Sequence, residues 1–105
     1  MKSIILIFIS LLSLNAFAGS TVFCDSIYDG SKLTIHIGFD QRVSSVRLEK
    51  DSASSQTFFA YFMNSFGETS TYSLSGTSDL LRTESTVENY GFGRAEIGRL
   101  NFDCN

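Results

Sequence analysis

The chain contains no tryptophan, no proline, one histidine and two cysteines among its 105 residues. A lone histidine limits metal and acid–base hypotheses, and two cysteines with no histidine nearby do not complete a zinc ligand set. Basic residues are also scarce: residues 19–105 carry seven, against eleven acidic residues, which gives a net charge near −4. Because phosphate binding needs a concentrated basic face, we expect no nucleic-acid partner.

Motifs of the common catalytic and cofactor classes are absent as well. There is no Gly-x-Ser-x-Gly elbow, no phosphate-cradling glycine loop and no dinucleotide fingerprint. The segment from Asp25 to Ser31 lacks the alternating oxygen ligands and terminal Glu of an EF-hand loop. We therefore name no catalytic residue and expect no metal and no cofactor.

The chain has one long apolar run, from Ile4 to Leu14. It follows Lys2 and precedes Ala16-Phe17-Ala18. A basic start, a short apolar stretch and a small-x-small triplet predict a signal peptide over residues 1–18, cut after Ala18. The run is shorter than the roughly 20 apolar residues that span a bilayer. We expect one exported domain, residues 19–105, that is periplasmic or secreted.

This domain has 87 residues, which constrains its relation to membranes. Eight membrane-spanning strands of about 10 residues each would use nearly all of them and leave no loops. We therefore expect no membrane-spanning part after signal cleavage.

Cys24 and Cys104 lie near the two ends of this domain. Exported compartments are oxidising, so the pair is predicted to form a disulfide. Closing a loop of about 80 residues stabilises a fold by roughly 4 kcal/mol on the chain-entropy model. For a chain with a limited core, this is comparable to the whole stability of many small domains.

What the chain does have is strand-forming sequence, rich in Ser, Thr and β-branched or aromatic residues. From Lys32 to Phe39 the residues Leu33, Ile35, Ile37 and Phe39 alternate with polar ones, which predicts a half-buried strand with His36 on its polar face. Asp29-Gly30 before it is a hairpin turn signal. Similar patterns predict further strands, listed as Val22–Tyr28, Val43–Lys50, Thr57–Met63, one around Tyr72 and Leu74, one from Leu81 to Val87, and two short ones or one bulged strand around Gly98.

These patterns predict an all-β fold, a small antiparallel meander of seven or eight strands. In a meander the first and last strands have open edges, and a disulfide from Cys24 to Cys104 needs Cα atoms about 5.5 Å apart. The pair therefore predicts a closed or nearly closed barrel, which also removes exposed edges. A β-sandwich with facing terminal strands is the alternative.

The segment from Phe58 to Met63 is the one predicted to take part in recognition. Its residues are apolar on both faces. If one face fills the core, the other needs a cover, because contiguous exposed aromatic residues are unusual in monomers. That cover is loop residues such as Phe66 or Phe92, a dimer partner or a ligand. Aromatic residues also anchor interfaces and carbohydrate-like ligands. We therefore predict Phe58, Tyr61 and Phe62 as binding residues for a protein or glycan.

Two cysteines near the ends of a short exported meander, with Tyr72-Ser73-Leu74-Ser75-Gly76 midway, make the layout similar to small periplasmic inhibitors of c-type lysozyme. That resemblance implies a compact β-barrel that inserts a loop into an enzyme's active site. The aromatic-Lys-Gly features of that family are missing, so no functional residue is carried over.

The sequence thus predicts a small exported, non-enzymatic, inhibitor-like or binding module. One alternative is a hydrolase of envelope polymers that uses two carboxylates, with Asp25, Asp29, Glu84 and Glu88 as examples, although each is expected to be solvated. The other is a structural protein that self-associates through Phe58–Met63.

Overall fold

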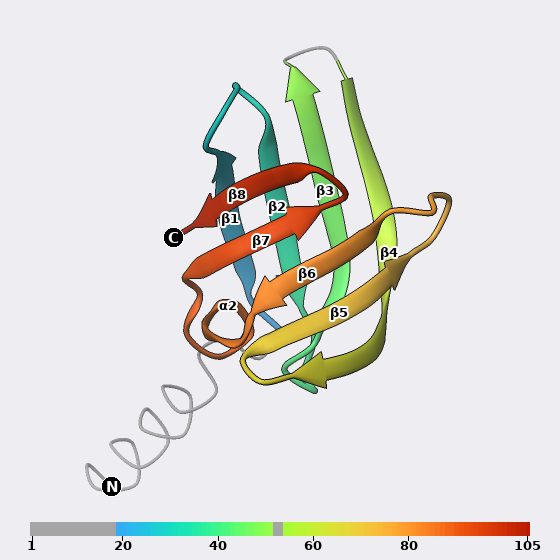
Figure 1. Ribbon diagram of the computed structural model, residues 1–105, viewed down its shortest axis with the longest axis vertical. Coiled ribbons are helices and arrows are strands. Elements are labelled where there is room, and N and C mark those ends of the chain that lie inside the picture. Colours follow the sequence, from blue (N-terminus) through green and yellow to red (C-terminus); the bar gives the residue numbers. More distant parts are fainter. Residues whose placement is uncertain (1–18, 52–53) are drawn as a thin grey trace, which may run out of the picture.

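The computed structural model describes residues 19–51 and 54–105, so the predicted signal peptide lies outside the described residues. Within them the chain forms eight antiparallel strands that close into a barrel, each strand paired with its sequence neighbours and β1 also paired with β8 (Figure 1). The predicted all-β barrel is confirmed. The elements are β1 (Thr21–Ser26), β2 (Lys32–Ile37), β3 (Val43–Asp51), β4 (Ser54–Phe66), β5 (Thr69–Leu74), β6 (Leu80–Glu84), α2 (Ser85–Tyr90), β7 (Gly93–Ile97) and β8 (Leu100–Cys104).

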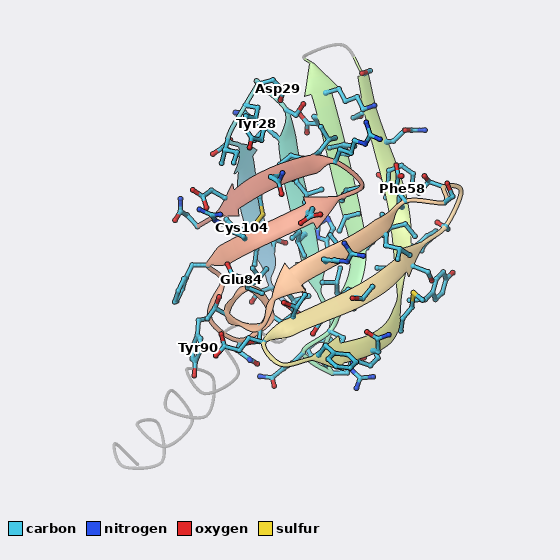
Figure 2. All side chains as sticks on the ribbon, viewed as in Figure 1. Tyr28, Asp29, Phe58, Glu84, Tyr90 and Cys104 are labelled. Atoms are coloured by element: carbon cyan, nitrogen blue, oxygen red, sulfur yellow. A yellow bond between two sulfur atoms is a disulfide. The ribbon has the colours of Figure 1, made fainter. Side chains whose placement is uncertain are left out.

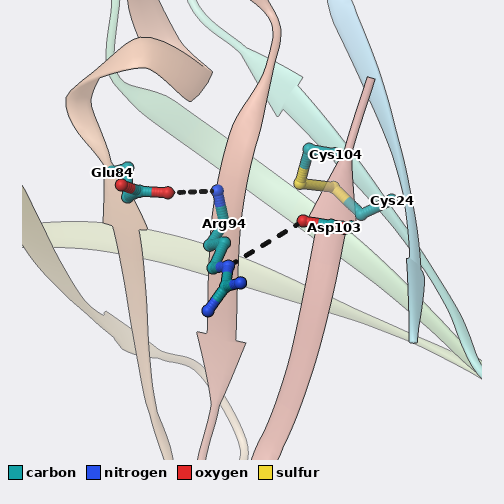
Figure 3. Close-up of a disulfide and its surroundings, with 5 residues drawn as sticks. All are labelled: Cys24, Glu84, Arg94, Asp103 and Cys104. Carbon is teal, nitrogen blue, oxygen red and sulfur yellow. Dashed lines mark hydrogen bonds and ion pairs between the residues drawn. A yellow bond between two sulfur atoms is a disulfide. The ribbon is translucent and has the colours of Figure 1, made fainter. Parts of the chain in front are cut away.

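The barrel closes at the seam between β1 and β8, where Cys24 lies directly opposite Cys104 and the two form the predicted disulfide (Figure 3). Their Cα atoms are 3.9 Å apart, closer than the expected spacing. The Asn105 N–H donates to the Phe23 carbonyl, which makes the adjoining cysteines a non-hydrogen-bonded pair, the kind that brings Cα atoms closest in antiparallel sheets.

Side chains inside the barrel follow the period-two pattern of the sequence. On β2, Leu33, Ile35 and Ile37 are buried and His36 is exposed, as predicted. The C-terminal segment resolves into two short strands with a tight turn at Gly98, whose φ is +57°. This turn explains the change of parity, because residues on either side of it belong to different strands. The buried apolar core comprises Val22, Cys24, Leu33, Ile35, Ile37, Val43, Val46, Leu48, Phe58, Tyr72, Leu74, Leu81, Val87, Ala95, Ile97, Phe102 and Cys104.

The predicted strands Val22–Tyr28 and Lys32–Phe39 are both two residues too long at their C-terminal ends, since β1 ends at Ser26 and β2 at Ile37. The expected strand through Phe39 ends at Ile37, because the chain turns there: the Gly38 N–H donates to the Arg42 carbonyl, and Gln41 takes a positive φ of 63°. Phe39, predicted to face inward, is 90% exposed.

The expected strand from Leu81 to Val87 is correct only as far as Glu84. The next residues form α2, which ends at Gly91 with a φ of 82° and with the Gly91 N–H donating to the Val87 carbonyl. This is the hydrogen bonding of a left-handed helix C-cap. Val87 is fully buried in the core, but it points inward from a helix at one end of the barrel. Among the described residues, no helix is both long and apolar enough to cross a membrane.

Turns alternate between the two ends of an up-and-down barrel, so each connecting loop, and any site near it, lies at one end or the other. The β2–β3 and β4–β5 turns share one end with α2, whereas the β3–β4, β5–β6 and β7–β8 connections share the other (Figure 1). We call these the helix end and the mouth.

Candidate functional site

The long strand β4 is the element that carries the predicted binding residues. Its first half pairs with β3 as far as Phe59 opposite Ser45, and its second half pairs with β5 from Ala60 opposite Leu74. A β-bulge at Met63 shifts the register within that second half. Because β4 changes partners between Phe59 and Ala60, it separates from β3 toward the helix end and leaves both strands partly uncovered there.

The three predicted binding residues lie in different environments. Phe58 is buried in the core and faces the interior near the mouth (Figure 2). Tyr61 points outward and is 59% exposed. Phe62 is half-buried and packs edge-on against the buried Tyr72, with ring centroids 5.7 Å apart. Only Tyr61 and Phe62 are therefore brought together at one surface.

The outward face of β4 carries Phe59, Tyr61 and Met63, a set that we call the β4 strip. These side chains are 61%, 59% and 52% exposed, respectively. Of the possible covers for the second face of this segment, the loop residues Phe66 and Phe92 do not serve, because the strip stays exposed and both loop residues are exposed themselves. The strip is thus an apolar row of the kind that marks interaction sites.

Next to the strip, the separation of β3 from β4 opens a hollow of about 440 Å³, which we call the β3–β4 cleft. The Arg42 guanidinium lies over the Phe62 ring, with Cζ 3.8 Å from the ring centroid, a cation–π contact. Asp40 accepts a hydrogen bond from the Arg42 backbone N–H at 3.1 Å and so holds the turn that carries the arginine. The cleft is lined by Asp40, Arg42, Val43, Ser44, Ala60, Tyr61 and Phe62.

Below Phe62, a buried polar pair joins the cleft to α2. The Tyr72 hydroxyl donates to Glu88 Oε2 at 2.8 Å and accepts from the Val43 N–H at 3.2 Å. Burial, as the largest cause, and the Glu88 carboxylate raise the pKa of Tyr72, against a lowering by the Val43 N–H. Glu88 was expected to be solvated, but it is only 5% exposed, because α2 turns it inward. The pair therefore anchors α2 and β3 to β5.

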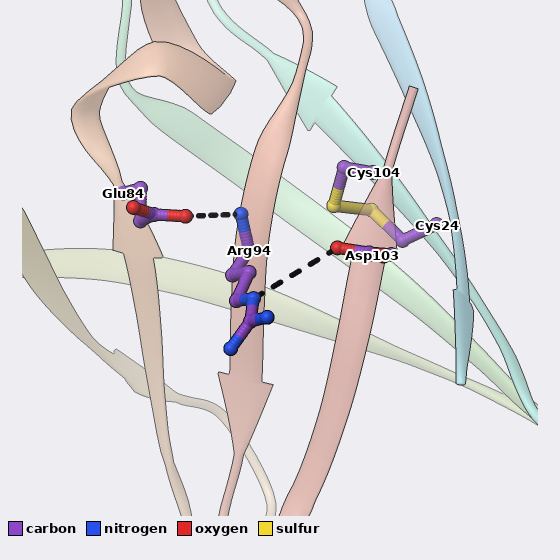
Figure 4. Close-up of polar contacts among 5 residues, drawn as sticks. All are labelled: Cys24, Glu84, Arg94, Asp103 and Cys104. Atoms are coloured by element: carbon purple, nitrogen blue, oxygen red, sulfur yellow. Dashed lines mark hydrogen bonds and ion pairs between the residues drawn. A yellow bond between two sulfur atoms is a disulfide. The ribbon is translucent and has the colours of Figure 1, made fainter. Parts of the chain in front are cut away.

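The carboxylates proposed for a hydrolase do not converge. Asp29 lies in the β1–β2 turn, at the opposite end of the barrel from Glu84 (Figure 2). Its Oδ1 accepts from the Ser31 N–H at 2.8 Å, the largest of the contacts that lower the pKa of Asp29. Glu84 Oε1 accepts from the Arg94 N–H at 2.7 Å, and the Arg94 side chain reaches Asp103 at 4.0 Å (Figure 4). These carboxylates hold turns and strand ends.

Arg42 is a functional-site candidate that the sequence pattern did not indicate. Glu88 was named only as a possible hydrolase carboxylate, and its buried place beneath the cleft was not predicted. Arg42 lies in a turn, where spacing carries no information on its stacking partner, and Glu88 alternates as if on a polar strand face. In the part of the chain that the structure describes, no three His, Cys, Asp or Glu residues gather in a group fit for a metal ion. Comparison with family models, with curated proteins and with solved structures finds no match to this chain.

Proposed function

We propose that this protein is an exported, non-enzymatic module that binds a partner protein through the β4 strip and the adjoining β3–β4 cleft. The observation that carries the proposal is the succession of three large, half-exposed apolar side chains beside an arginine stacked on an aromatic ring. The disulfide fits the oxidising compartment that export to the periplasm or the medium would supply.

The composition of this surface supports a protein as partner. Aromatic residues, methionine and arginine are enriched in the cores of protein–protein interfaces, and tyrosine and arginine dominate their hot spots. The strip offers Phe59, Tyr61 and Met63, and the cleft offers Arg42. A side chain of the partner that enters the cleft would contact the guanidinium and the Tyr61 ring together.

The scaffold beneath this surface supports rigid presentation. Phe62, under the guanidinium, packs on Tyr72, and Tyr72 is hydrogen-bonded to both α2 and β3. A preorganised surface loses little conformational entropy on binding, which favours affinity.

The test is recovery of a specific partner from periplasmic or envelope extracts by purified protein, wild type against Tyr61→Ser and Phe59→Ser. Phe23→Ser is the matched control, because Phe23 is an aromatic residue on the outer face of β1 with a similar exposure of 65%. We expect the partner to be lost with Tyr61→Ser and Phe59→Ser and kept with Phe23→Ser. Equal recovery by all variants, or no specific partner, contradicts the proposal.

Self-association and hydrolysis are the alternatives to this proposal. If the β4 strip binds a second copy, light scattering will show a dimer that Tyr61→Ser converts to a monomer. The hydrolase finds less support, because Asp25, Asp29, Glu84 and Glu88 do not meet in one hollow. Release of sugars or peptides from envelope polymers, abolished by a single carboxylate substitution, is the result that favours it.

A further inference from the structure

The mouth of the barrel contains a second hollow, separate from the β3–β4 cleft. It measures about 490 Å³, within the range of sites that take small molecules. Leu48, Phe58 and Ile97 are buried core residues that form its apolar floor, together with the half-buried Leu100. Barrel mouths are among the places where ligand sites occur most often.

The distribution of positive charge singles out this hollow. Of the seven basic residues in the described chain, Arg47, Arg82 and Arg94 form ion pairs with Glu49, Glu96 and Asp103. Arg42 lies on Phe62, and Lys32 lies opposite Glu49 and Asp25 in the sheet, although it forms no ion pair with either. The two remaining, Lys50 and Arg99, both line the mouth, and neither forms an ion pair with a carboxylate whose side chain the structure describes, a set that does not include Asp51.

The backbone directs both cations to the mouth. Lys50 falls at the register shift between Glu49 and Asp51, so it is the extra residue of a β-bulge, a device that re-aims a side chain. Arg99 is the second residue of the two-residue β7–β8 turn, after Gly98 in the left-handed region. Among the described residues that line the hollow, Asp79 is the one carboxylate, so this described lining keeps a positive excess.

We propose that the mouth binds a small amphipathic anion, with its apolar part on Phe58 and Leu48 and its anionic group between Lys50 and Arg99. An apolar floor alone would accept any small hydrophobic molecule. Two cations that form no ion pair with a described carboxylate side chain add selection for negative charge, in a protein whose net charge is itself negative. The site lies at the opposite end from the cleft and does not depend on the proposed partner protein.

The test is titration calorimetry of the oxidised protein with decanoate, decanol and decyltrimethylammonium, repeated with Lys50→Gln, Arg99→Gln and the double variant. We expect decanoate to bind most tightly, each single variant to bind it about fivefold more weakly and the double variant more weakly still. Arg47→Gln, which removes a paired cation, is the control and should bind decanoate like the wild type. Equal affinity for the three probes, or unchanged decanoate binding by the double variant, overturns the proposal.

A second arm distinguishes a free anion from a lipid headgroup. Competition of decanoate by phosphatidylglycerol vesicles, but not by phosphatidylcholine vesicles, supports the same site with an anionic lipid as the source of its ligand. Decanoate binding that neither vesicle affects supports a free anion. Binding to phosphatidylglycerol vesicles without any decanoate binding overturns the site, since charge attraction alone then accounts for it.

Discussion

Reduction of the Cys24–Cys104 bond is expected to destabilise the protein and to open the barrel at one place, the β1–β8 seam. The bond spans 80 residues of sequence, so its chain-entropy contribution is about 4 kcal/mol. Small domains have roughly 5–15 kcal/mol in total. The seam itself is short, since it pairs only residues 24–26 with 102–104, and it sets Asp25 directly opposite Asp103, a like-charge pair.

The assay is urea unfolding with and without a phosphine reductant, followed by hydrogen exchange of the reduced protein. We expect the free energy of unfolding to fall by about 4 kcal/mol and the amides of β1 and β8 to lose protection before those of β3 and β4. The double variant Cys24→Ala/Cys104→Ala is the control, since the reductant should leave it unchanged. A loss below about 1 kcal/mol, or early exchange in β3 and β4, refutes the reasoning.

Three further substitutions test the buried polar pair, the close backbone approach at Gly93 and the role of Asp29. Tyr72→Phe leaves Glu88 Oε2 and the Val43 N–H without their buried partner and should cost about 1–3 kcal/mol in urea unfolding; an unchanged midpoint contradicts it. The pKa of Tyr72 is raised in the fold, so the neutral hydroxyl contributes its full stabilisation below the ordinary tyrosine pKa. That contribution to the free energy of unfolding is lost as pH rises above the ordinary pKa. In alkaline titrations the free energy of unfolding should therefore fall less steeply for Tyr72→Phe than for the wild type. Gly93→Ala should destabilise strongly, since Gly93 has a φ of +134° and a Cβ there would collide with Thr86 Oγ1; thermal unfolding like that of the wild type refutes this. The pKa of Asp29 is lowered, mainly by the Ser31 N–H. The wild type should therefore be more stable than Asp29→Asn above the ordinary aspartate pKa, and this difference in stability should vanish as pH falls through the lowered pKa of Asp29. A difference in stability that does not change with pH contradicts that cause.

The closed meander was predictable because two signals agreed. Alternation on β2 fixed which face is buried, and the cysteines near both ends required the terminal strands to meet. The helix was missed for a physical reason: residues 85–88, Ser-Thr-Val-Glu, contain a single apolar residue, and one apolar position fits a strand as well as one helical turn. Gly91 is the one local signal for the helix. It ends α2 because glycine readily adopts the left-handed backbone conformation, with a positive φ, that this C-cap requires.

The candidate site was predictable only in part. The sequence drew attention to the segment from Phe58 to Met63, but it gave no means to choose between its two faces, because both are apolar. Which of the two faces is buried depends on how β5 and the core pack against β4. The stacking of Arg42 on Phe62 arises from the separation of β3 and β4, a tertiary feature with no local pattern.

The most direct test of the binding role is photo-crosslinking with benzoylphenylalanine placed at position 61 and, in a second protein, at position 23. Both positions are exposed aromatic sites on outer strand faces. After exposure to envelope extracts and irradiation, the protein labelled at 61 should yield one covalent adduct of defined mass, and the protein labelled at 23 should not. No adduct at 61, or the same adducts from both positions, contradicts a binding surface on β4.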